Sequence, residues 1–444
     1  MTTTITVREY ARLTTSRIEQ PTLDTAQVSP SAFDWLCDLN SRFTQAGAAI
    51  VQVQDRRWLK LDNYVGVVET PCGTRIEILP KHFEDGDCVA DSRALLQCMI
   101  QKSLNLPTRK VGFTGLQRFD TPLTEWLMSR FLDALDHLIK LGLRFDYQRL
   151  EEEQRFLKGQ LNASSQMRQP ASRQHRFQIR HDVFLPDRPE NRLLRTALDV
   201  VCKTTQEPTN WRLAHKLRTM LLELPRSRDT GRDFEQWRED QLMAHYQPIK
   251  PWCKLIIQHL TPLAVAGDWR GLSLLFPMER LFESYVAGCL RDSLGPESAL
   301  RTQMTGKYLC TQGERGLFRL RPDLIIELAG KQWILDTKWK HLDSETTGKN
   351  YGLVQSDLYQ MFAYGHKYLE AAGDLVLIYP KTSRFLKALE VFEYGPGLAL
   401  WVVPFDLEKG RLVTADGAPF GQPSPLLSQP NEMEASEQNV PADM

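Results

Sequence analysis

The sequence predicts an α/β protein, and three observations support this fold class. A helical pattern, two apolar strands, a second helical pattern and a buried strand follow one another in the carboxy-terminal third. Strand-like segments dominate the amino-terminal end, and helical spacing of apolar residues dominates the middle. We therefore expect a β-rich module at 1–85, a mainly helical region at 86–265, a mixed sheet flanked by helices at 266–420, and a disordered tail rich in Pro, Ser, Gln and Glu at 421–444.

Short strands are expected throughout the amino-terminal module. They are predicted at Ile5–Tyr10, Ile50–Val53, Tyr64–Val68 and Arg75–Leu79, with a helix near Phe33–Leu39 and turn residues at Pro71–Gly73. A module of this kind binds either a protein partner or a nucleic acid. Its sequence carries no signature that chooses between them.

The middle region contains helices and one segment of different character. Its clearest helix is predicted from Pro122 to about Leu141, and further helices at about 191–224 and 252–265. At 144–184, basic residues alternate with Gln, Ser and Asn, and large apolar residues are few. We expect this basic arm either to be solvated or to dock elsewhere. For any one of its residues, a solvated loop or a contact with DNA phosphate is an alternative to a contact with a protein partner.

The segment Arg321–Lys338 carries the clearest chemical signal. Two apolar strands flank Ala329-Gly330, which predicts a β-hairpin with a two-residue turn. In that register Asp323 lies directly opposite Asp336, with Cβ atoms roughly 5 Å apart. Lys338 is two residues beyond Asp336 and points to the same face. Two acids and one base are therefore expected at the open end of the hairpin.

This grouping suits metal-assisted hydrolysis of a phosphodiester. Opposed carboxylates repel each other unless a cation neutralises them, and carboxylate oxygens suit Mg²⁺. An ammonium beside the metal can orient an attacking water or hold a phosphate. The alternative is a solvated strand end with a weak surface ion pair between Asp336 and Lys338. Apolar residues on both faces of the hairpin favour the metal site.

Two predicted helices and a strand flank this hairpin. An amphipathic helix is expected over Pro277–Leu290, where Glu283 either reaches the metal or is solvated or paired with an Arg. A second helix is expected to open with a capping box at Asp357–Gln360. Its first turn either meets a phosphate through free N–H groups, Tyr359 and Gln360, or consists of ordinary helical residues. A buried parallel strand is predicted at Leu375–Pro380, after a right-handed crossover.

Composition excludes several classes of protein. Acidic and basic residues number 55 each, so no global field draws the chain to DNA or membranes. Eight cysteines without a Cys-x-x-Cys pair indicate reduced thiols in a cytoplasmic protein rather than a zinc site or a disulfide framework. No segment has the length and apolarity of a membrane span. A G-x-x-x-x-G-K-[ST] phosphate loop is also missing, so nucleotide-driven movement would come from another polypeptide.

The ordered segments resemble the PD-(D/E)xK nuclease superfamily and, more narrowly, the McrC family, the nuclease subunits of McrBC-type modification-dependent restriction systems. The resemblance covers roughly 145–405. The matching segments are Phe276–Tyr285, Arg321–Asp323, Ile334–Lys338, Asp357–Met361, Phe156–Leu161 and Asn191–Ala197.

The resemblance implies a Mg²⁺-dependent endonuclease acting on DNA, methylated DNA in particular, in cytoplasmic antiviral defence. Asp323 and Asp336 would be metal ligands, Lys338 the catalytic lysine, and Glu283 the helix acid. In such proteins the region of the basic arm helps to form a stalk that enters the ring of an AAA+ GTPase, McrB, and stimulates it. Arg155 and Lys158 would then contact the partner.

Three functions follow from these observations. The chain is expected to be the nuclease subunit of a restriction complex that a separate AAA+ GTPase activates. The alternatives are an adaptor that mainly stimulates a partner NTPase, and a stand-alone repair nuclease. The recognised base, the role of 1–85, the stoichiometry, the number of metal ions and the choice between GTP and ATP stay open.

Overall fold

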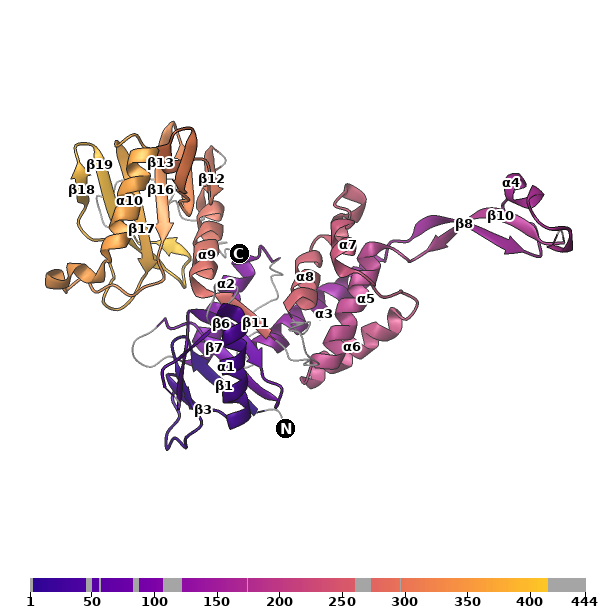
Figure 1. Cartoon of the computed structure of the whole chain (residues 1–444), viewed down its shortest axis with the longest axis horizontal. Helices are drawn as coiled ribbons and strands as arrows, with labels where there is room; N and C mark the ends of the chain where they lie inside the picture. Colours follow the sequence, from indigo (N-terminus) through magenta and orange to yellow (C-terminus); the bar gives the residue numbers. More distant parts are fainter. Residues whose placement is uncertain are drawn as a thin grey trace, which may run out of the picture. The chain divides into compact units, whose positions relative to one another are not determined.

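The computed structural model of the chain describes residues 3–44, 50–55, 57–82, 88–106, 122–173, 175–259, 273–295 and 297–413. The predicted tail at 421–444 and the end of the helix expected up to 265 lie outside these ranges. The chain forms two compact units (Figure 1). One comprises Met1–Gly66, Cys72–Phe119 and Leu275–Met444, and the other Val67–Pro71 and Asp120–Leu274. Helices and several sheets occur together, which confirms the predicted α/β class.

Short strands and two helices begin the first unit. Its elements are β1 (Thr3–Arg8), β2 (Arg12–Thr14), β3 (Thr25–Gln27), α1 (Pro30–Thr44), β4 (Val51–Val53), β5 (Trp58–Leu61), β6 (Tyr64–Glu69), β7 (Thr74–Leu79) and α2 (Val89–Ser103). β1 runs parallel to β7, while β3, β2, β5 and β4 form another sheet in that order. The four strands and the helix expected here are confirmed as β1, β4, β6, β7 and α1.

A seven-stranded sheet forms the carboxy-terminal part of the first unit. The elements are β11 (Ser273–Pro277), α9 (Met278–Ser293), β12 (Ser298–Thr302), β13 (Tyr308–Gln312), β14 (Arg315–Arg319), β15 (Leu324–Leu328), β16 (Lys331–Thr337), α10 (Gln355–Tyr368), β17 (Gly373–Pro380), β18 (Phe392–Gly395), β19 (Leu398–Asp406) and β20 (Arg411–Leu412). The strand order is β12-β15-β16-β17-β19-β18, with β20 beside β19. β12, β15 and β16 are antiparallel, and β16, β17 and β19 are parallel. The sheet is therefore mixed, as expected.

The hairpin of β15 and β16 has the predicted register. Leu328 pairs with Lys331, and Leu324 pairs with Leu335 at the other end. Ala329 and Gly330 both have positive φ, 48° and 76°. That combination belongs to a type I′ turn, whose twist matches that of the paired strands.

Helices α9 and α10 both contact this sheet. The buried stripe of α10, with Met361 and Tyr364, packs against Ile325 and Ile334 of the hairpin and Leu375 of β17. Gly365 allows this close approach, because a Cβ there would lie 2.7 Å from a methyl group of Leu398. On α9, the ring of Phe282 packs against Trp339 and Phe405. Both helices therefore pack against the sheet that contains the hairpin.

The start of α10 differs from the prediction. The capping box at Asp357–Gln360 is wrong, because the helix begins at Gln355 after Val354, which makes no side-chain cap. Asp357 instead accepts a hydrogen bond from the Lys340 ammonium at 2.8 Å. The carboxylate therefore joins the helix to the segment after β16, a contact that local sequence spacing does not reveal.

The second unit consists of helices and a long antiparallel ribbon. Its elements are α3 (Leu123–Leu141), β8 (Asp146–Gln154), β9 (Gln160–Leu161), α4 (Ala163–Met167), β10 (Phe177–Leu185), α5 (Pro189–Thr204), α6 (Pro208–Met220), α7 (Thr230–Glu235) and α8 (Lys250–His259). α3 has nearly the predicted bounds, and the helices expected at about 191–224 are α5 and α6. None of the helices in the described part of the chain is long and apolar enough to span a membrane.

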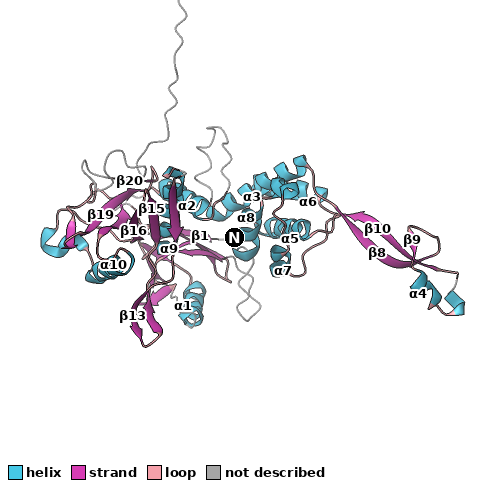
Figure 2. Ribbon diagram, turned by 90° about the horizontal axis from the view of Figure 1, so that it is seen from above, coloured by secondary structure: helices cyan, strands magenta, loops and turns pink. Residues whose placement is uncertain are grey.

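The segment expected as a basic arm is the ribbon of β8 and β10, which extends away from the helices of its unit (Figures 1 and 2). β9 pairs with the opposite edge of β10, so the connecting loop 155–159 crosses the ribbon. Its charge is more balanced than the sequence suggested, because Arg180 pairs with Glu151 at 2.5 Å and Arg176 with Glu153 at 3.1 Å. These ion pairs join the two strands across the ribbon.

Candidate active site

Asp323 and Asp336 enter the site from the two strands of the hairpin. Asp323 directly precedes β15, and the register that pairs Leu324 with Leu335 carries it opposite Asp336 of β16. Asp323 Oδ2 accepts two hydrogen bonds from Thr337, one from the backbone N–H and one from the hydroxyl, both at 2.8 Å. These bonds fix one oxygen of Asp323 toward the end of β16.

Asp336 is a buried carboxylate with one ionic partner. The residue is 1% exposed, and its Oδ2 lies 2.5 Å from Lys338 Nζ. Its Oδ1 has no hydrogen-bond partner among the residues that the structure describes. Burial raises the pKa of Asp336 to about 7, and repulsion from Asp323 adds to this effect, while Lys338 opposes it. Burial also raises the pKa of Asp323. A bound cation would therefore stabilise the charged forms of these two carboxylates.

Lys338 is held as an ammonium by its neighbours. Burial lowers the pKa of this lysine, but the charges of Asp336 and Asp323 outweigh burial, and the pKa stays above its ordinary value. Lys338 Nζ also donates to Gln360 Oε1 at 3.1 Å. Gln360 in turn donates to the Tyr364 hydroxyl at 2.7 Å, which donates to the Arg321 carbonyl at 2.8 Å. This chain ties α10 to both strands of the hairpin.

Glu283 lies at the edge of the same group. It accepts a hydrogen bond from the Gln303 side chain at 2.9 Å, and Gln303 N–H donates to the Asp323 carbonyl oxygen at 2.8 Å. Burial raises the pKa of Glu283, and the negative charge of Asp323 raises it further. The structure thus brings the acid of α9 to the Asp323 side of the site, where it is bonded to an amide.

The structure separates the two residues predicted at the start of α10. Gln360 lies in the site beside Lys338, whereas Tyr359 is 64% exposed and its hydroxyl is bonded to Gln355. The sequence did not single out Tyr364 or the Lys340–Asp357 pair. Helical spacing of four residues between Gln360 and Tyr364 is the signal that would have identified the tyrosine.

The residues fit a divalent cation of the magnesium type. Mg²⁺ keeps several waters and needs only one or two protein carboxylates. Asp323 and Asp336 supply two, and Asp336 Oδ1 is a buried acceptor without a donor. Within the described ranges there is no group of three or more His, Cys, Asp and Glu side chains that could hold a metal. The donor set therefore suits an ion that is otherwise coordinated by water and substrate, rather than a closed structural site.

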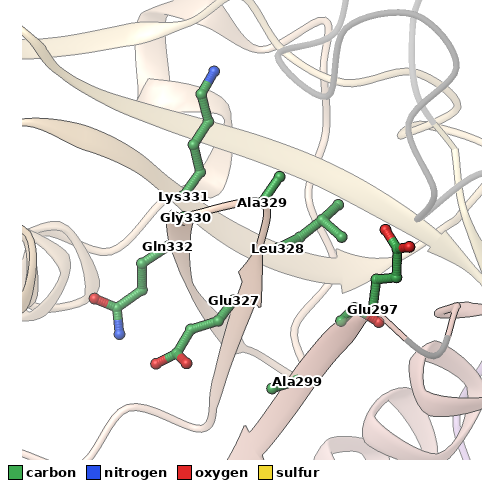
Figure 3. A pocket seen from close by; sticks show the side chains of 9 residues that line it. Glu297, Ala299, Glu327, Leu328, Ala329, Gly330, Lys331 and Gln332 are labelled. Carbon is green, nitrogen blue, oxygen red and sulfur yellow. The ribbon is translucent and has the colours of Figure 1, made fainter.

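A pocket of about 540 Å³ lies at the other end of the hairpin (Figure 3). Its lining includes Glu327, Lys331 and Gln332, around the Ala329–Gly330 turn. Lys331 and Asp336 are five residues apart on β16, a separation of roughly 17 Å along a strand. The pocket is therefore distinct from the group formed by Asp323, Asp336 and Lys338.

The two residues predicted to contact a partner lie in the other unit. Arg155 and Lys158 are exposed in the loop 155–159, beside Phe156 and Leu157, which are 79% and 59% exposed. Gly159 ends this loop with φ of +75°, and a Cβ there would lie 2.6 Å from the Arg180 carbonyl oxygen. A glycine is thus required where the loop crosses β10.

Comparisons with known proteins agree with this architecture. A solved structure described as a refined half-complex from a tetradecameric assembly of Thermococcus gammatolerans McrB AAA+ hexamers with bound McrC is similar, with a TM-score of 0.69, 16% identity, and coverage of 92% of this chain and 98% of that chain. The cryo-EM structure of the Thermococcus gammatolerans McrBC complex matches with a TM-score of 0.51 and 19% identity, covering 66% of this chain and 88% of that chain. A search of curated proteins finds no match.

These likenesses to solved structures define the fold, a mixed α/β architecture. The family model for the McrBC 5-methylcytosine restriction system component matches residues 59–380. The chain belongs to the McrBC family, as its sequence segments indicated.

Proposed function

We propose that this chain is the Mg²⁺-dependent DNA endonuclease subunit of a restriction complex, activated by an AAA+ GTPase partner. The observation that carries the proposal is the convergence of Asp323, Asp336 and Lys338 at the open end of one hairpin. The order α9-β12-β15-β16-α10-β17, interrupted by β13 and β14, supports the proposal because it agrees with the α-β-β-β-α-β order expected of a PD-(D/E)xK nuclease.

The three side chains divide the work of phosphodiester hydrolysis. Asp323 and Asp336 would hold the cation, which supplies Lewis-acid activation of the phosphate and a more acidic bound water. Thr337 keeps Asp323 in place through its N–H and hydroxyl groups. Lys338, as an ammonium, donates hydrogen bonds to the attacking water or to the scissile phosphate. Gln360 and Tyr364 restrict the Lys338 side chain to the metal side of the sheet.

The ribbon of the second unit is the proposed contact with the AAA+ partner. Its loop exposes Arg155 and Lys158 together with Phe156 and Leu157. Apolar side chains of this size are seldom left in water without a binding role when they gather at one loop. This observation favours the adaptor function as well, and the two functions are compatible in one subunit.

Co-purification with an AAA+ protein of the McrB type tests the proposal. The complex is assayed on methylated and plain duplex DNA with Mg²⁺, with GTP or ATP. We expect cleavage only with the partner, nucleotide and Mg²⁺, and loss of cleavage in Asp323→Ala, Asp336→Ala and Lys338→Ala. Retained cleavage in all three variants would refute the assignment. Cleavage by the purified chain alone, without nucleotide, would instead identify a stand-alone nuclease.

Replacing Arg155 and Lys158 tests the adaptor function separately. We expect the double variant Arg155→Ala/Lys158→Ala to lower the partner's hydrolysis rate while the metal site stays intact. Arg149→Ala is the matched control, because Arg149 lies on the same ribbon in an ion pair with Asp182. Equal hydrolysis rates with the wild-type and double-variant proteins would exclude these two residues from stimulation.

A further inference from the structure

A second ribbon, formed by β13 and β14, lies immediately before the candidate active site in the sequence. It pairs only with itself and belongs to none of the larger sheets. Every residue of β13 is exposed. Figure 2 shows the ribbon extending from the sheet that contains β15 and β16. β14 ends at Arg319, four residues before Asp323.

The base of this ribbon is attached to the helix that supports the site. Lys307 Nζ donates to the Lys367 carbonyl oxygen at 2.6 Å and lies 5.1 Å from the centre of the Tyr368 ring. The Tyr368 hydroxyl donates to the Leu320 carbonyl oxygen at 3.2 Å. Helix α10 therefore holds both ends of the ribbon, and the same helix carries Gln360 beside Lys338.

The ribbon and the residues next to it carry an excess of positive charge. Arg315, Arg319 and Arg321 are exposed, and none forms an ion pair within the part of the chain that the structure describes. Residues 307–321 hold four basic side chains and one acidic side chain, Glu314, whereas the whole chain is balanced at 55 each. The ribbon of β8 and β10 differs, because Arg176 there has an acidic partner.

An exposed aromatic ring stands among these arginines. Phe318 is 72% exposed and has φ of 53°, a left-handed conformation that is costly for an aromatic residue. The paired register passes from Tyr308–Arg319 to Cys310–Leu317 and omits Phe318. The neighbouring Tyr308 ring is less exposed, at 38%, and lies over Gly316 so closely that a Cβ there would be 2.4 Å away. Strain at an exposed ring indicates a side chain held ready for a contact.

We propose that the β13–β14 ribbon enters a groove of the duplex DNA that the nuclease site cleaves. This inference rests on the proposed function, since it names the surface that grips that substrate. A two-stranded ribbon fits the major groove of B-DNA, and guanidinium groups bind phosphates and guanine edges. The charge of Arg315 and Arg319 complements the phosphate backbone, and Phe318 supplies an apolar contact to bases. Because the ribbon is attached to α10, the bound duplex would lie beside Lys338.

DNA binding measured apart from cleavage tests this inference. The full complex, carrying Asp323→Asn to prevent cleavage, is titrated with a labelled duplex at several salt concentrations. We expect Arg315→Ala/Arg319→Ala to weaken binding roughly tenfold and to reduce the salt slope by about 2, because each lost phosphate contact contributes about 0.9. Phe318→Ala is expected to weaken binding less and to leave the salt slope unchanged.

Arg301→Ala is the matched control, because Arg301 is an exposed arginine of neighbouring β12 in an ion pair with Glu327. Unchanged binding in the double arginine variant, or no DNA binding by the wild-type complex, overturns the inference. Loss of the partner or of self-association, with DNA binding intact, also overturns it and assigns the ribbon to a protein contact. If the wild-type complex never cleaves DNA but the arginine substitutions still weaken DNA binding, the nuclease assignment is refuted. The role of the ribbon in DNA binding is then still supported.

Discussion

Trp339 donates its indole N–H to Glu9 Oε1 at 2.7 Å, although 330 positions separate the two residues in sequence. Glu9 is fully buried, and the same oxygen accepts the Lys81 backbone N–H at 2.8 Å. Trp339 directly follows Lys338, and its ring packs against Phe282 of α9. A buried carboxylate of the amino-terminal module thus fixes the backbone next to the candidate catalytic lysine.

Glu9 should make the stability of the protein depend on pH. Burial raises the pKa of Glu9 from 4.5 to about 7, against opposing hydrogen bonds from Lys81 and Trp339. The folded chain therefore keeps a proton that the unfolded chain releases near pH 4.5. The associated stability is present below that pH and is lost as pH rises to about 7, by roughly 3 kcal/mol at most. Thermal unfolding from pH 5 to 8 measures it.

Glu9→Gln and Glu9→Leu separate the charge from the hydrogen bonds. The amide oxygen of Gln still accepts from Trp339 and Lys81, so we expect Glu9→Gln to flatten the pH dependence and to retain cleavage. Leu removes both acceptors, and we expect a lower melting temperature and weaker cleavage. Identical pH profiles of the wild-type and Glu9→Gln proteins would contradict the assignment of this titration.

Asp323→Asn should abolish cleavage without harming the fold. The Asn side-chain oxygen still accepts from Thr337 N–H and Oγ1–H, and repulsion of Asp336 is removed. We expect cleavage to fall roughly 100-fold or more, with a metal-free melting temperature equal to or above that of the wild type. Asp374→Asn is the control on β17, where the carboxylate accepts a hydrogen bond from the Trp401 indole N–H. Cleavage near the wild-type rate would remove Asp323 from the site.

Lys338→Met should destabilise the metal-free protein more at pH 8 than at pH 6. The substitution leaves Asp336 buried without its counter-ion, a loss of roughly 3 kcal/mol when the carboxylate is charged. At pH 6 Asp336 can take up a proton, because its pKa is already about 7 in the presence of Lys338. Melting temperatures at both pH values provide the measurement. Equal losses at pH 6 and pH 8 would mean that the two residues are not coupled.

Tyr364→Phe should slow cleavage through Lys338. Removal of the hydroxyl breaks the bonds to Gln360 and to the Arg321 carbonyl, at about 1 kcal/mol of stability. We expect a several-fold lower cleavage rate with DNA affinity unchanged, since the Tyr364 side chain is buried. Tyr359→Phe is the matched control, because Tyr359 is exposed on the same helix and its hydroxyl is bonded to Gln355 instead of to the site. Equal rates for both variants would show that the chain of hydrogen bonds does not position Lys338.

Gly159→Ala should impair stimulation of the partner while the nuclease site is unaffected. A Cβ at this position meets both the Arg180 carbonyl oxygen and His181 Cβ at 2.6 Å, so the loop carrying Arg155 and Lys158 must shift. Gly142→Ala is the control, because Gly142 also has positive φ but faces open space. The partner's hydrolysis rate is measured with each variant. A normal hydrolysis rate with Gly159→Ala would show that stimulation of the partner does not depend on the conformation of this loop.

Local rules were sufficient to predict the centre of the site. A two-residue turn and a period of two fix the register of β15 and β16, so the opposition of Asp323 and Asp336 follows from sequence alone. The helix of Glu283 and the parallel strand after the crossover were also predictable from apolar periodicity. Gln360 was predicted as part of a capping box that does not form, yet its side chain is hydrogen-bonded to Lys338.

Long-range pairing could not be predicted in the same way. Glu9 and Trp339 come together only when two distant segments fold, and neither carries a local signal of the other. Asp357 was predicted to cap the helix because aspartate is a common capping residue, but its carboxylate accepts a hydrogen bond from the Lys340 ammonium instead. The regular structure at 144–184 escaped prediction because cross-strand ion pairs such as Arg180–Glu151 replace the usual alternation of apolar residues.

The turn at Ala329–Gly330 limits how this protein can change over evolution. A change in turn length that shifts the pairing by one residue would move Asp336 to the opposite side of the sheet from Asp323. Substitutions in the strands would leave the spacing of the two acids intact, whereas a change in loop length far from any reacting atom would dismantle it. The two-residue length of this turn thus sets the register that places the two acids opposite each other.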